Sequence, residues 1–409
     1  MPRVYMDHAA TTDVLPAVIE AVTEQMRAGG NPSSLHSAGR RARATVEYAR
    51  EQIAGLAGCD SAEVIFTSGG TEADNLAVKG LYWKRREVNP QAVRIILSAV
   101  EHHAVGDAAE WLEKHENAEL TWLQPDGDGR IAPETLREAI GDHPETVALV
   151  TVMWANNEVG TVQPVSQLAA VAAEYGIPFH TDAVQAFGTL PLNFRASGVS
   201  TMAISAHKIG GPMGVGALIA TRATGLTPVL HGGGQERSVR SGTIDAASIA
   251  GFGEAAKWVG QNLKQEGQRL AQLRNRLVEG VLAAIPEVTL RGAPLETPEQ
   301  TVDGAGRLPG NAHFTFPGCE GDSLLFLLDM AGIESSTGSA CNAGVPRPSH
   351  VLLAMGLTEY EARGAQRFTL GHTSTEAEVD ALLAALPAAW AQAKKAGMAD
   401  HTPDAGRWN

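Results

Sequence analysis

The stretch Val64-Ile65-Phe66-Thr67-Ser68-Gly69-Gly70-Thr71-Glu72-Ala73-Asp74-Asn75 combines an apolar strand, a glycine turn and the start of a helix. Backbone N–H groups at such a turn face outward, and with the helix dipole they form a site suited to phosphate. An ordinary capped turn between a strand and a helix has the same pattern. The choice between these two interpretations depends on the rest of the chain.

Apolar runs of strand length recur after this stretch. We expect buried strands at Glu63 to Thr67, Val93 to Ser98, Val147 to Met153, Pro178 to Thr181 and Val215 to Ala220. Helix-length patterns such as Val165 to Tyr175 separate most of them. This alternation predicts an α/β fold with a mostly parallel sheet.

Two amphipathic helices stand out at the borders of this region. The first has Pro16 in its first turn and either Thr12 or Asp13 as its cap. Its apolar face consists of Leu15, Val18, Ile19, Val22 and Met26. The second follows the region 251–260, and its apolar face consists of Leu270, Leu273, Leu277 and Val281.

Later segments such as Ala312 to Thr315 have the pattern of separate short strands. We therefore expect a domain boundary near residue 261, with residues 13–260 as a large domain and residues 1–12 and 261–409 as a smaller α+β domain. Residues 293–309 are rich in Pro, Gly and charge, which is typical of a surface connection, and residues 399–409 have the composition of a frayed tail.

The composition limits the possible functions. The chain has 409 residues, 44% of them hydrophobic, so it can bury a large core. Its formal net charge of −14 argues against nucleic acid or an anionic membrane as the main partner. We expect a cytoplasmic protein, because no apolar stretch has the roughly 18 residues needed to span a bilayer and no secretory pattern is present.

Lys208 and Asp182 point to a cofactor. Lys208 lies in Ser205-Ala206-His207-Lys208-Ile209-Gly210-Gly211-Pro212, and Asp182 lies in His180-Thr181-Asp182-Ala183-Val184-Gln185. A lone lysine is usually a surface charge, and a lone aspartate after a strand is often only a helix cap. Together, however, an amine that can form an imine and an acid that can pair with a pyridinium nitrogen match what pyridoxal phosphate requires.

Other polar segments follow predicted strands, where open α/β sheets bind their ligands. His102 in Ser98-Ala99-Val100-Glu101-His102-His103 could stack on a ring, although a histidine there is more often structural. Asn157 in Asn156-Asn157-Glu158-Val159-Gly160 could donate to a ring substituent or simply form a turn. The glycine-rich segments 231–236 and 240–243 could equally be surface loops.

The histidines and cysteines lack the spacing of a metal site, so we expect no metal site in this protein.

The three cysteines are too few and too scattered for a disulfide framework. Cys341 lies in Ser335-Ser336-Thr337-Gly338-Ser339-Ala340-Cys341-Asn342-Ala343-Gly344, where small residues leave a thiol accessible. We expect Cys341 to be reactive and Cys59 and Cys319 to behave as small hydrophobic residues.

The ordered set of Lys208, Asp182, Gln185, His102, Thr71 and Cys341 resembles the cysteine desulfurases, the class V branch of the fold-type I pyridoxal-phosphate enzymes. The resemblance runs from Tyr5-Met6-Asp7-His8-Ala9-Ala10-Thr11-Thr12 to Arg367-Phe368-Thr369-Leu370-Gly371. The serine-rich context of Cys341 resembles the first of the two desulfurase groups. The large domain would then bind the cofactor, and the small domain would carry the catalytic-cysteine loop at residues 334–350.

The resemblance also implies a role for each matching residue. Lys208 would hold pyridoxal 5'-phosphate as an imine, His102 would stack on its ring, and Asp182 would pair with the ring nitrogen. Asn157 and Gln185 would contact ring substituents, while the phosphate would be bound by Gly70, Thr71, Ser205 and His207. Thr243 would reach the phosphate of a neighbouring subunit in a homodimer. Arg367, with Asn31 nearby, would hold the substrate carboxylate.

The expected reaction converts L-cysteine to L-alanine and leaves the sulfur on Cys341 as a persulfide, with Lys208 as the base. The sulfur would then pass to an acceptor protein, either an iron–sulfur scaffold or a tRNA-thiolating enzyme. A selenocysteine lyase or another class V aminotransferase is an alternative that need not use Cys341 in this way. A catalytically idle scaffold is a more distant one.

Overall fold

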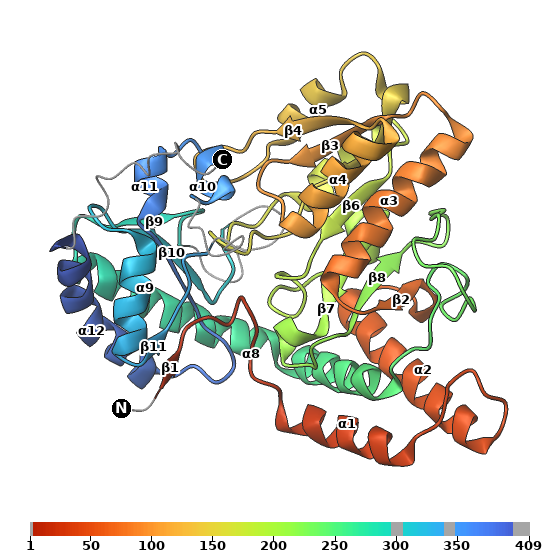
Figure 1. The fold of residues 1–409 in the computed structure, drawn as a ribbon, viewed down its shortest axis with the longest axis horizontal. Coiled ribbons are helices and arrows are strands. Elements are labelled where there is room, and N and C mark those ends of the chain that lie inside the picture. Colours follow the sequence, from red (N-terminus) through yellow and green to blue (C-terminus); the bar gives the residue numbers. More distant parts are fainter. Residues whose placement is uncertain (1–2, 296–305, 339–347, 396–409) are drawn as a thin grey trace, which may run out of the picture.

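The structure, a computed structural model, describes residues 3–295, 306–338 and 348–395. Within this part of the chain, a seven-stranded sheet forms the centre of one half of the molecule and a three-stranded sheet forms the centre of the other (Figure 1). No helix among the described residues is long and apolar enough to cross a membrane.

The large sheet has the strand order β2-β8-β7-β6-β5-β3-β4. Its strands are β2 (Val64–Thr67), β3 (Arg94–Ser98), β4 (Glu119–Leu123), β5 (Val147–Thr151), β6 (Phe179–Asp182), β7 (Thr201–Ser205) and β8 (Gly216–Ala220). β8 runs antiparallel to the other six strands of this sheet, so the prediction of a mostly parallel α/β sheet is confirmed.

The five predicted strands are present with ends shifted by one or two residues, but β4 and β7 were not predicted. The sequence of β7 is Thr-Met-Ala-Ile-Ser, and all five residues are buried. Its small and hydroxyl-bearing residues do not form an apolar run. β4 lies at the sheet edge, and Leu123 is the only one of its five residues that is buried, so its apolar pattern is weak.

Helices cover both faces of this sheet. α3 (Gly70–Val88) and α4 (His103–Glu116) pack on one face through apolar side chains such as Val78 and Leu112. The other face is covered by α1 (Pro16–Ala28), α2 (Ser37–Ala57), α5 (Pro133–Ile140), α6 (Val165–Glu174), α7 (Phe194–Ser197) and the start of α8 (Ala246–Ala284). Short 3-10 turns occupy residues 61–63, 144–146 and 206–209.

The N-terminal cap of α1 was predicted wrongly. Pro16 is the first residue of the helix, as expected, but its N-cap is Leu15, without a side-chain cap. Thr12 instead hydrogen-bonds His8, and Asp13 accepts a hydrogen bond from Thr373. Thr12 thus makes a local contact and Asp13 a tertiary contact, and neither side chain caps the helix as local sequence rules predict.

The long helix α8 begins earlier than the sequence indicates, because it includes the glycine-containing region 251–260. An added Cβ at Gly253 would lie 2.5 Å from Ala49 Cα of α2, and one at Gly251 would lie 2.7 Å from Val22 of α1. The glycines therefore allow close helix packing rather than ending the helix. The domain boundary near residue 261 stays a prediction, since α8 crosses it without a break.

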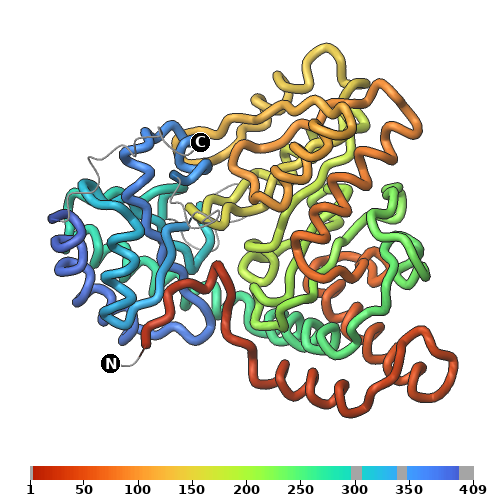
Figure 2. Tube along the Cα trace, in the orientation of Figure 1, coloured from red at the N-terminus to blue at the C-terminus, as the bar shows by residue number. Residues whose placement is uncertain are grey.

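The second half of the molecule joins the two ends of the chain. Its sheet consists of β9 (Thr289–Arg291), β10 (Asn311–Thr315) and β12 (Ala365–Thr369), and β1 (Val4–Tyr5) pairs with β11 (Ile333–Glu334) beside it. The helices there are α9 (Gly321–Met330), α10 (His350–Ala354), α11 (Glu359–Arg363) and α12 (Glu376–Lys395). The N-terminal segment runs alongside this C-terminal part before it crosses to α1 (Figure 2).

Candidate active site

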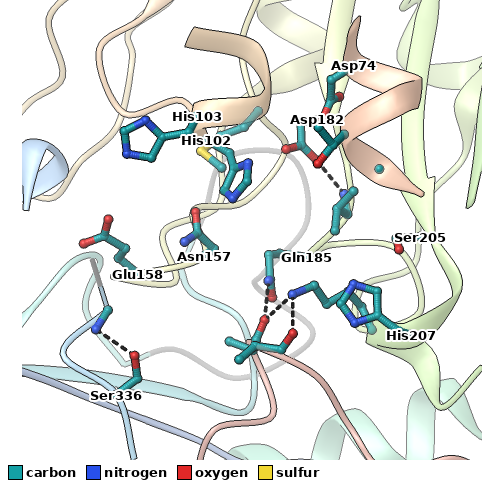
Figure 3. Close-up of a pocket in the computed structure, with 18 of the residues that line it drawn as sticks. Asp74, His102, His103, Asn157, Glu158, Asp182, Gln185, Ser205, His207 and Ser336 are labelled. Atoms are coloured by element: carbon teal, nitrogen blue, oxygen red, sulfur yellow. Dashed lines mark hydrogen bonds between the residues drawn. The ribbon is translucent and has the colours of Figure 1, made fainter. Parts of the chain in front are cut away.

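A cavity of about 350 Å³ opens at the carboxyl ends of the parallel strands. Asp182 is the last residue of β6 and Ser205 the last of β7, while Gly70 follows β2 and His102 follows β3. Asp74 and Asp182 lie together at one end of the cavity, and Glu158 and Ser336 lie at the other (Figure 3). The site thus forms where the sequence predicts it, at the edge where strands give way to helices.

Lys208 is held at the cavity wall by backbone carbonyls. Its Nζ donates hydrogen bonds to Ala9 O at 2.6 Å and Ala10 O at 2.8 Å. Burial lowers the pKa of Lys208 to about 8, helped by the positive charge of Arg367 and opposed by the carboxylate of Asp182. A lysine with this pKa has a substantial neutral fraction near neutral pH, as a nucleophilic amine requires.

Three buried carboxyl groups lie close together at the cavity, where Asp182 and Asp74 form part of the wall and Glu101 does not. Asp182 is only 5% exposed, and its Oδ1 accepts a hydrogen bond from Val184 N at 2.8 Å. Burial raises the pKa values of Asp182, Asp74 and Glu101, and the negative charge of Asp182 raises those of the other two further. A cation beside Asp182 would offset the desolvation of its carboxylate.

His102 is oriented by the helix that it caps. Its Nδ1 accepts the N–H of Ala104 at 3.1 Å, so the proton of the neutral ring is on Nε2. Gln185 donates to Ala9 O at 2.9 Å, the same carbonyl that Lys208 contacts. His102, Asn157 and Gln185 line the cavity between its two ends (Figure 3).

The four predicted phosphate ligands, Gly70, Thr71, Ser205 and His207, all line the cavity. Gly70 and Thr71 open α3, whose N-terminal amides present positive partial charge. An added Cβ at Gly70 would lie 2.7 Å from Val184 Cγ2, so only glycine fits this wall. The Nδ1 of His207 lies 3.2 Å from Thr11 Oγ1, and burial lowers its pKa to about 4, which keeps this ring neutral.

Arg367 has a buried guanidinium that contacts two other segments. Its Nη1 donates to Asn157 O at 2.9 Å, and its Nη2 donates to Asp7 Oδ1 at 2.7 Å. The third nitrogen, Nε, is buried without a hydrogen-bond partner among the described residues. Arg367 lines the cavity, so its positive charge suits an anionic ligand group there.

Two of the predicted site residues that the structure describes do not line the cavity. Asn31 lies on the exposed connection between α1 and α2, where its Oδ1 accepts from Ser33 N, and Thr243 is exposed just before α8. Cys341 lies outside the described residues, but Ser336 and Gly338, which precede it in the sequence, line the cavity.

The other two cysteines occupy structural positions. Cys319 is buried, which confirms the prediction, and Cys59 is partly buried against the core. Burial raises the pKa of each thiol to about 12. At neutral pH both are therefore protonated and poor nucleophiles.

Several functional residues were missed from the sequence. Asp7 pairs with Arg367, and Asp74 joins Asp182 through the buried carboxyl cluster, with its Oδ1 at 3.2 Å from His180 Nε2. Glu158, Ser336 and His350 also line the cavity. A helix-embedded aspartate such as Asp74 carries no local signal, because it becomes part of the site only through tertiary packing.

The residues present fit pyridoxal phosphate. The cavity places an amine with a lowered pKa, a buried acid and a helix N-terminus within one space. Among the described residues there is no group of three or more potential metal ligands.

Comparison with known sequences gives a consistent result. The family model "Aminotransferase class-V" matches residues 4–382. The chain is 55% identical over 395 residues to an IscS-like cysteine desulfurase of Mycobacterium tuberculosis, covering 97% of this chain and 98% of that protein. It is 42% identical over 389 residues to a cysteine desulfurase IscS of Clostridium botulinum, covering 94% of each chain.

Solved structures show the same fold. The NifS-like protein of Rickettsia africae superposes with a TM-score of 0.82 at 32% identity, covering 95% of this chain and 99% of that chain. A structure described as SspA in complex with cysteine superposes with a TM-score of 0.75 at 34% identity, covering 90% and 98% of the two chains.

Proposed function

Because the chain belongs to the class-V aminotransferase family and, within it, to the pyridoxal-phosphate-dependent cysteine desulfurases, we propose that it converts L-cysteine to L-alanine and retains the sulfur on Cys341. The single observation that carries this proposal is that Lys208 and Asp182 face the same cavity as Ser336 and Gly338, which lead to Cys341. Cys341 is three positions after Gly338 in the sequence, a stretch that spans at most about 11 Å.

The cofactor would be held by groups at both ends of the cavity. Lys208 would bind it covalently through Nζ, and Asp182 would accept the proton of the ring nitrogen. His102 would lie against the ring, and the N-terminus of α3 would bind the phosphate. When bound, pyridoxal phosphate supplies an electron sink for the charge left at the substrate Cα.

Arg367 and Lys208 would prepare the substrate. The substrate carboxylate would bind the guanidinium of Arg367, which lines the cavity. The amine of Lys208 would take the Cα proton of the bound substrate. Its lowered pKa allows it both to accept and to return a proton near neutral pH.

Cys341 would carry out the sulfur transfer. Its thiolate would attack the substrate sulfur, so that an S–S bond forms and the Cβ–S bond breaks. The electron pair of the broken bond stays with the substrate carbon, which takes up a proton to become the methyl group of alanine. L-cysteine and the Cys341 thiol thus become L-alanine and a Cys341 persulfide, with no other oxidant or reductant.

The test combines a chemical label with product analysis. Borohydride reduction of the enzyme incubated with pyridoxal phosphate should fix the cofactor to Lys208, as peptide mass mapping would show. The enzyme should form equal amounts of alanine and protein persulfide in a single turnover with L-cysteine, and Lys208→Ala should form neither. A label on another residue, or alanine formation by Lys208→Ala, would contradict the proposal.

The partners are part of this proposal. The active unit would be a homodimer in which Thr243 of one subunit contacts the phosphate in the other, because Thr243 is exposed and lies away from the cavity of its own chain. The persulfide sulfur would be delivered to an iron–sulfur scaffold or a tRNA-thiolating enzyme in the cytoplasm. Affinity capture with the persulfide-loaded enzyme, compared with Cys341→Ser, would identify the acceptor.

A further inference from the structure

Arg240, in the segment between β8 and α8, contacts Glu72 in the first turn of α3, which follows β2. This segment is the green loop beside β2 and β8 in Figure 1. Nε of Arg240 donates to Glu72 Oε1 at 2.7 Å, and its Nη2 donates to Glu72 Oε2 at 3.2 Å. Both side chains are mostly buried, at 15% and 19% exposure, so this ion pair is only weakly screened by solvent.

Glu72 connects this ion pair to the glycine turn. Its Oε2 also accepts the backbone N–H of Ser68 at 2.7 Å. Burial alone would raise the pKa of Glu72, but the hydrogen bonds from Arg240 and Ser68 lower it below its usual value. Glu72 is therefore ionised at neutral pH, next to Gly70 and Thr71, whose segment would receive the phosphate.

The Glu72 carboxylate would repel a phosphate bound at this turn, and the positive charge of Arg240 offsets that repulsion. A carboxylate in the first turn of α3 occupies the positive end of the helix and repels a phosphate dianion. The guanidinium of Arg240 cancels that charge while its two hydrogen bonds keep the Glu72 carboxylate directed at Ser68.

We propose that Arg240 is a positioning residue for the cofactor phosphate, acting through Glu72 on the turn Thr67 to Thr71. The inference rests on the proposed function, because it takes the phosphate to be that of pyridoxal phosphate. Arg240 itself need not touch the cofactor, since it does not line the cavity.

The segment before Arg240 is anchored independently. Glu236 accepts hydrogen bonds from Arg50 at 2.8 and 2.9 Å and from Phe66 N at 3.0 Å, and it forms a β-bridge with Arg240. Between them, Arg237 and Ser238 have φ angles of 51° and 60°, a conformation that non-glycine residues keep only when their surroundings impose it. Arg240 is thus held at a fixed distance from the edge strand β2.

The phosphate contribution can be measured without turnover. Pyridoxal lacks the phosphate but can still react with Lys208, so the ratio of the dissociation constants of pyridoxal and pyridoxal phosphate isolates the phosphate interaction. Both constants would be measured by absorbance titration of the cofactor-free full chain. Arg240→Gln should lower the ratio about tenfold while the pyridoxal constant stays within about twofold of wild type.

A second substitution separates this role from a merely structural one. In Glu72→Gln/Arg240→Gln the repelling charge is gone, and the amide oxygen that replaces the Glu72 carboxylate oxygen can still accept the N–H of Ser68. The ratio should therefore return to within about threefold of wild type.

Arg240→Lys keeps the positive charge and should retain most of the ratio, which covers the case that Arg240→Gln does not fold. Arg137→Gln, which breaks an exposed bidentate pair with Glu174, is the matched control and should change neither constant.

Two results would overturn the inference: an unchanged ratio in Arg240→Gln, or a ratio in the double variant as low as in Arg240→Gln alone. If these occur while the wild type still forms its Lys208 adduct, only the role of Arg240 fails. A wild-type chain that does not bind pyridoxal phosphate would overturn both the inference and the proposed function.

Discussion

Lys208 shows how a single residue acquires its chemistry from its surroundings. Its amine is held by the carbonyls of Ala9 and Ala10, nearly two hundred positions away in the chain, and burial lowers its pKa to about 8. The same residue on an open surface would be protonated at neutral pH and unable to form an imine at a useful rate.

The lowered pKa of Lys208 predicts a pH dependence for cofactor capture. Only the neutral amine reacts, so the neutral fraction should rise from about one tenth at pH 7 to about nine tenths at pH 9, and then level off. The rate of the borohydride-trapped Lys208 adduct on cofactor-free enzyme should follow this curve. N-acetyl-lysine amide, with its ordinary pKa, is the control and should keep rising. A tenfold further increase for the enzyme above pH 9 would show that the Lys208 pKa is not lowered.

The three cysteines should differ sharply in their contribution to activity. Cys341→Ser should bind the cofactor normally but lose alanine and persulfide formation by on the order of a hundredfold or more, because a hydroxyl is a poor nucleophile toward sulfur. Cys59→Ser and Cys319→Ser should keep their turnover, since burial holds the pKa of both thiols near 12. Product analysis with L-cysteine distinguishes them, and undiminished activity of Cys341→Ser would refute the proposed sulfur transfer.

Among the elements, α8 is the one whose sequence and packing disagree most. Glycine normally lowers helix stability by about 1 kcal/mol relative to alanine. In α8, however, Gly253 lies directly against the backbone of Ala49, which leaves no room for a methyl group. The gain from close packing of α2 on α8 offsets the loss in helix propensity.

Two glycines of α8 should therefore respond in opposite directions to alanine. Gly253→Ala should destabilise the protein by about 1–3 kcal/mol, because its Cβ would lie 2.6 Å from the Cβ of Ala49. Gly260→Ala should stabilise it by up to about 1 kcal/mol, because that exposed site has no atom within 4 Å of an added Cβ. Urea denaturation at equal protein concentration would measure both, and a stabilising Gly253→Ala would show that the helices can separate at little cost.

At the scale of the whole molecule, the proposed homodimer accounts for a predicted site residue that does not line the cavity of its own chain. Thr243 is exposed and does not line the cavity of its own chain, although the family resemblance assigns it to a phosphate. A second copy of the chain would complete the set. Light scattering should then give about twice the 42.9 kDa mass of the chain.

Mixed dimers provide a direct test of this shared site. A dimer of one Lys208→Ala chain and one Thr243→Ala chain should contain one fully intact site, since the functional Lys208 and the intact Thr243 come from different subunits. A dimer of wild type with the double variant Lys208→Ala/Thr243→Ala should contain none, so it should have the weaker affinity for pyridoxal phosphate. If the dimer of wild type with the double variant instead binds pyridoxal phosphate more tightly, Thr243 acts in the site of its own chain.

Much of the architecture and of the site was predictable from local sequence. Apolar runs between helix-length patterns predicted five strands of the central sheet, because period and length are local properties of the chain. Asp182, His102 and the glycine turn follow predicted strands, and parallel strands bring their carboxyl ends to one edge. Lys208 follows β7, which was not predicted, and was assigned to the site by its pairing with Asp182. These residues could therefore be assigned to a common cavity before any contact was known.

Tertiary structure alone decided how those residues are held and charged. Asp7 and Arg367 are 360 positions apart, and Arg240 meets Glu72 across 168 positions, so no periodicity or motif spacing indicates either pair. Burial is likewise a property of the folded molecule, and it is what lowers the pKa of Lys208 and raises that of Asp182. Sequence determined which groups are present at the sheet edge, whereas the surrounding dielectric and long-range contacts determined their protonation and orientation.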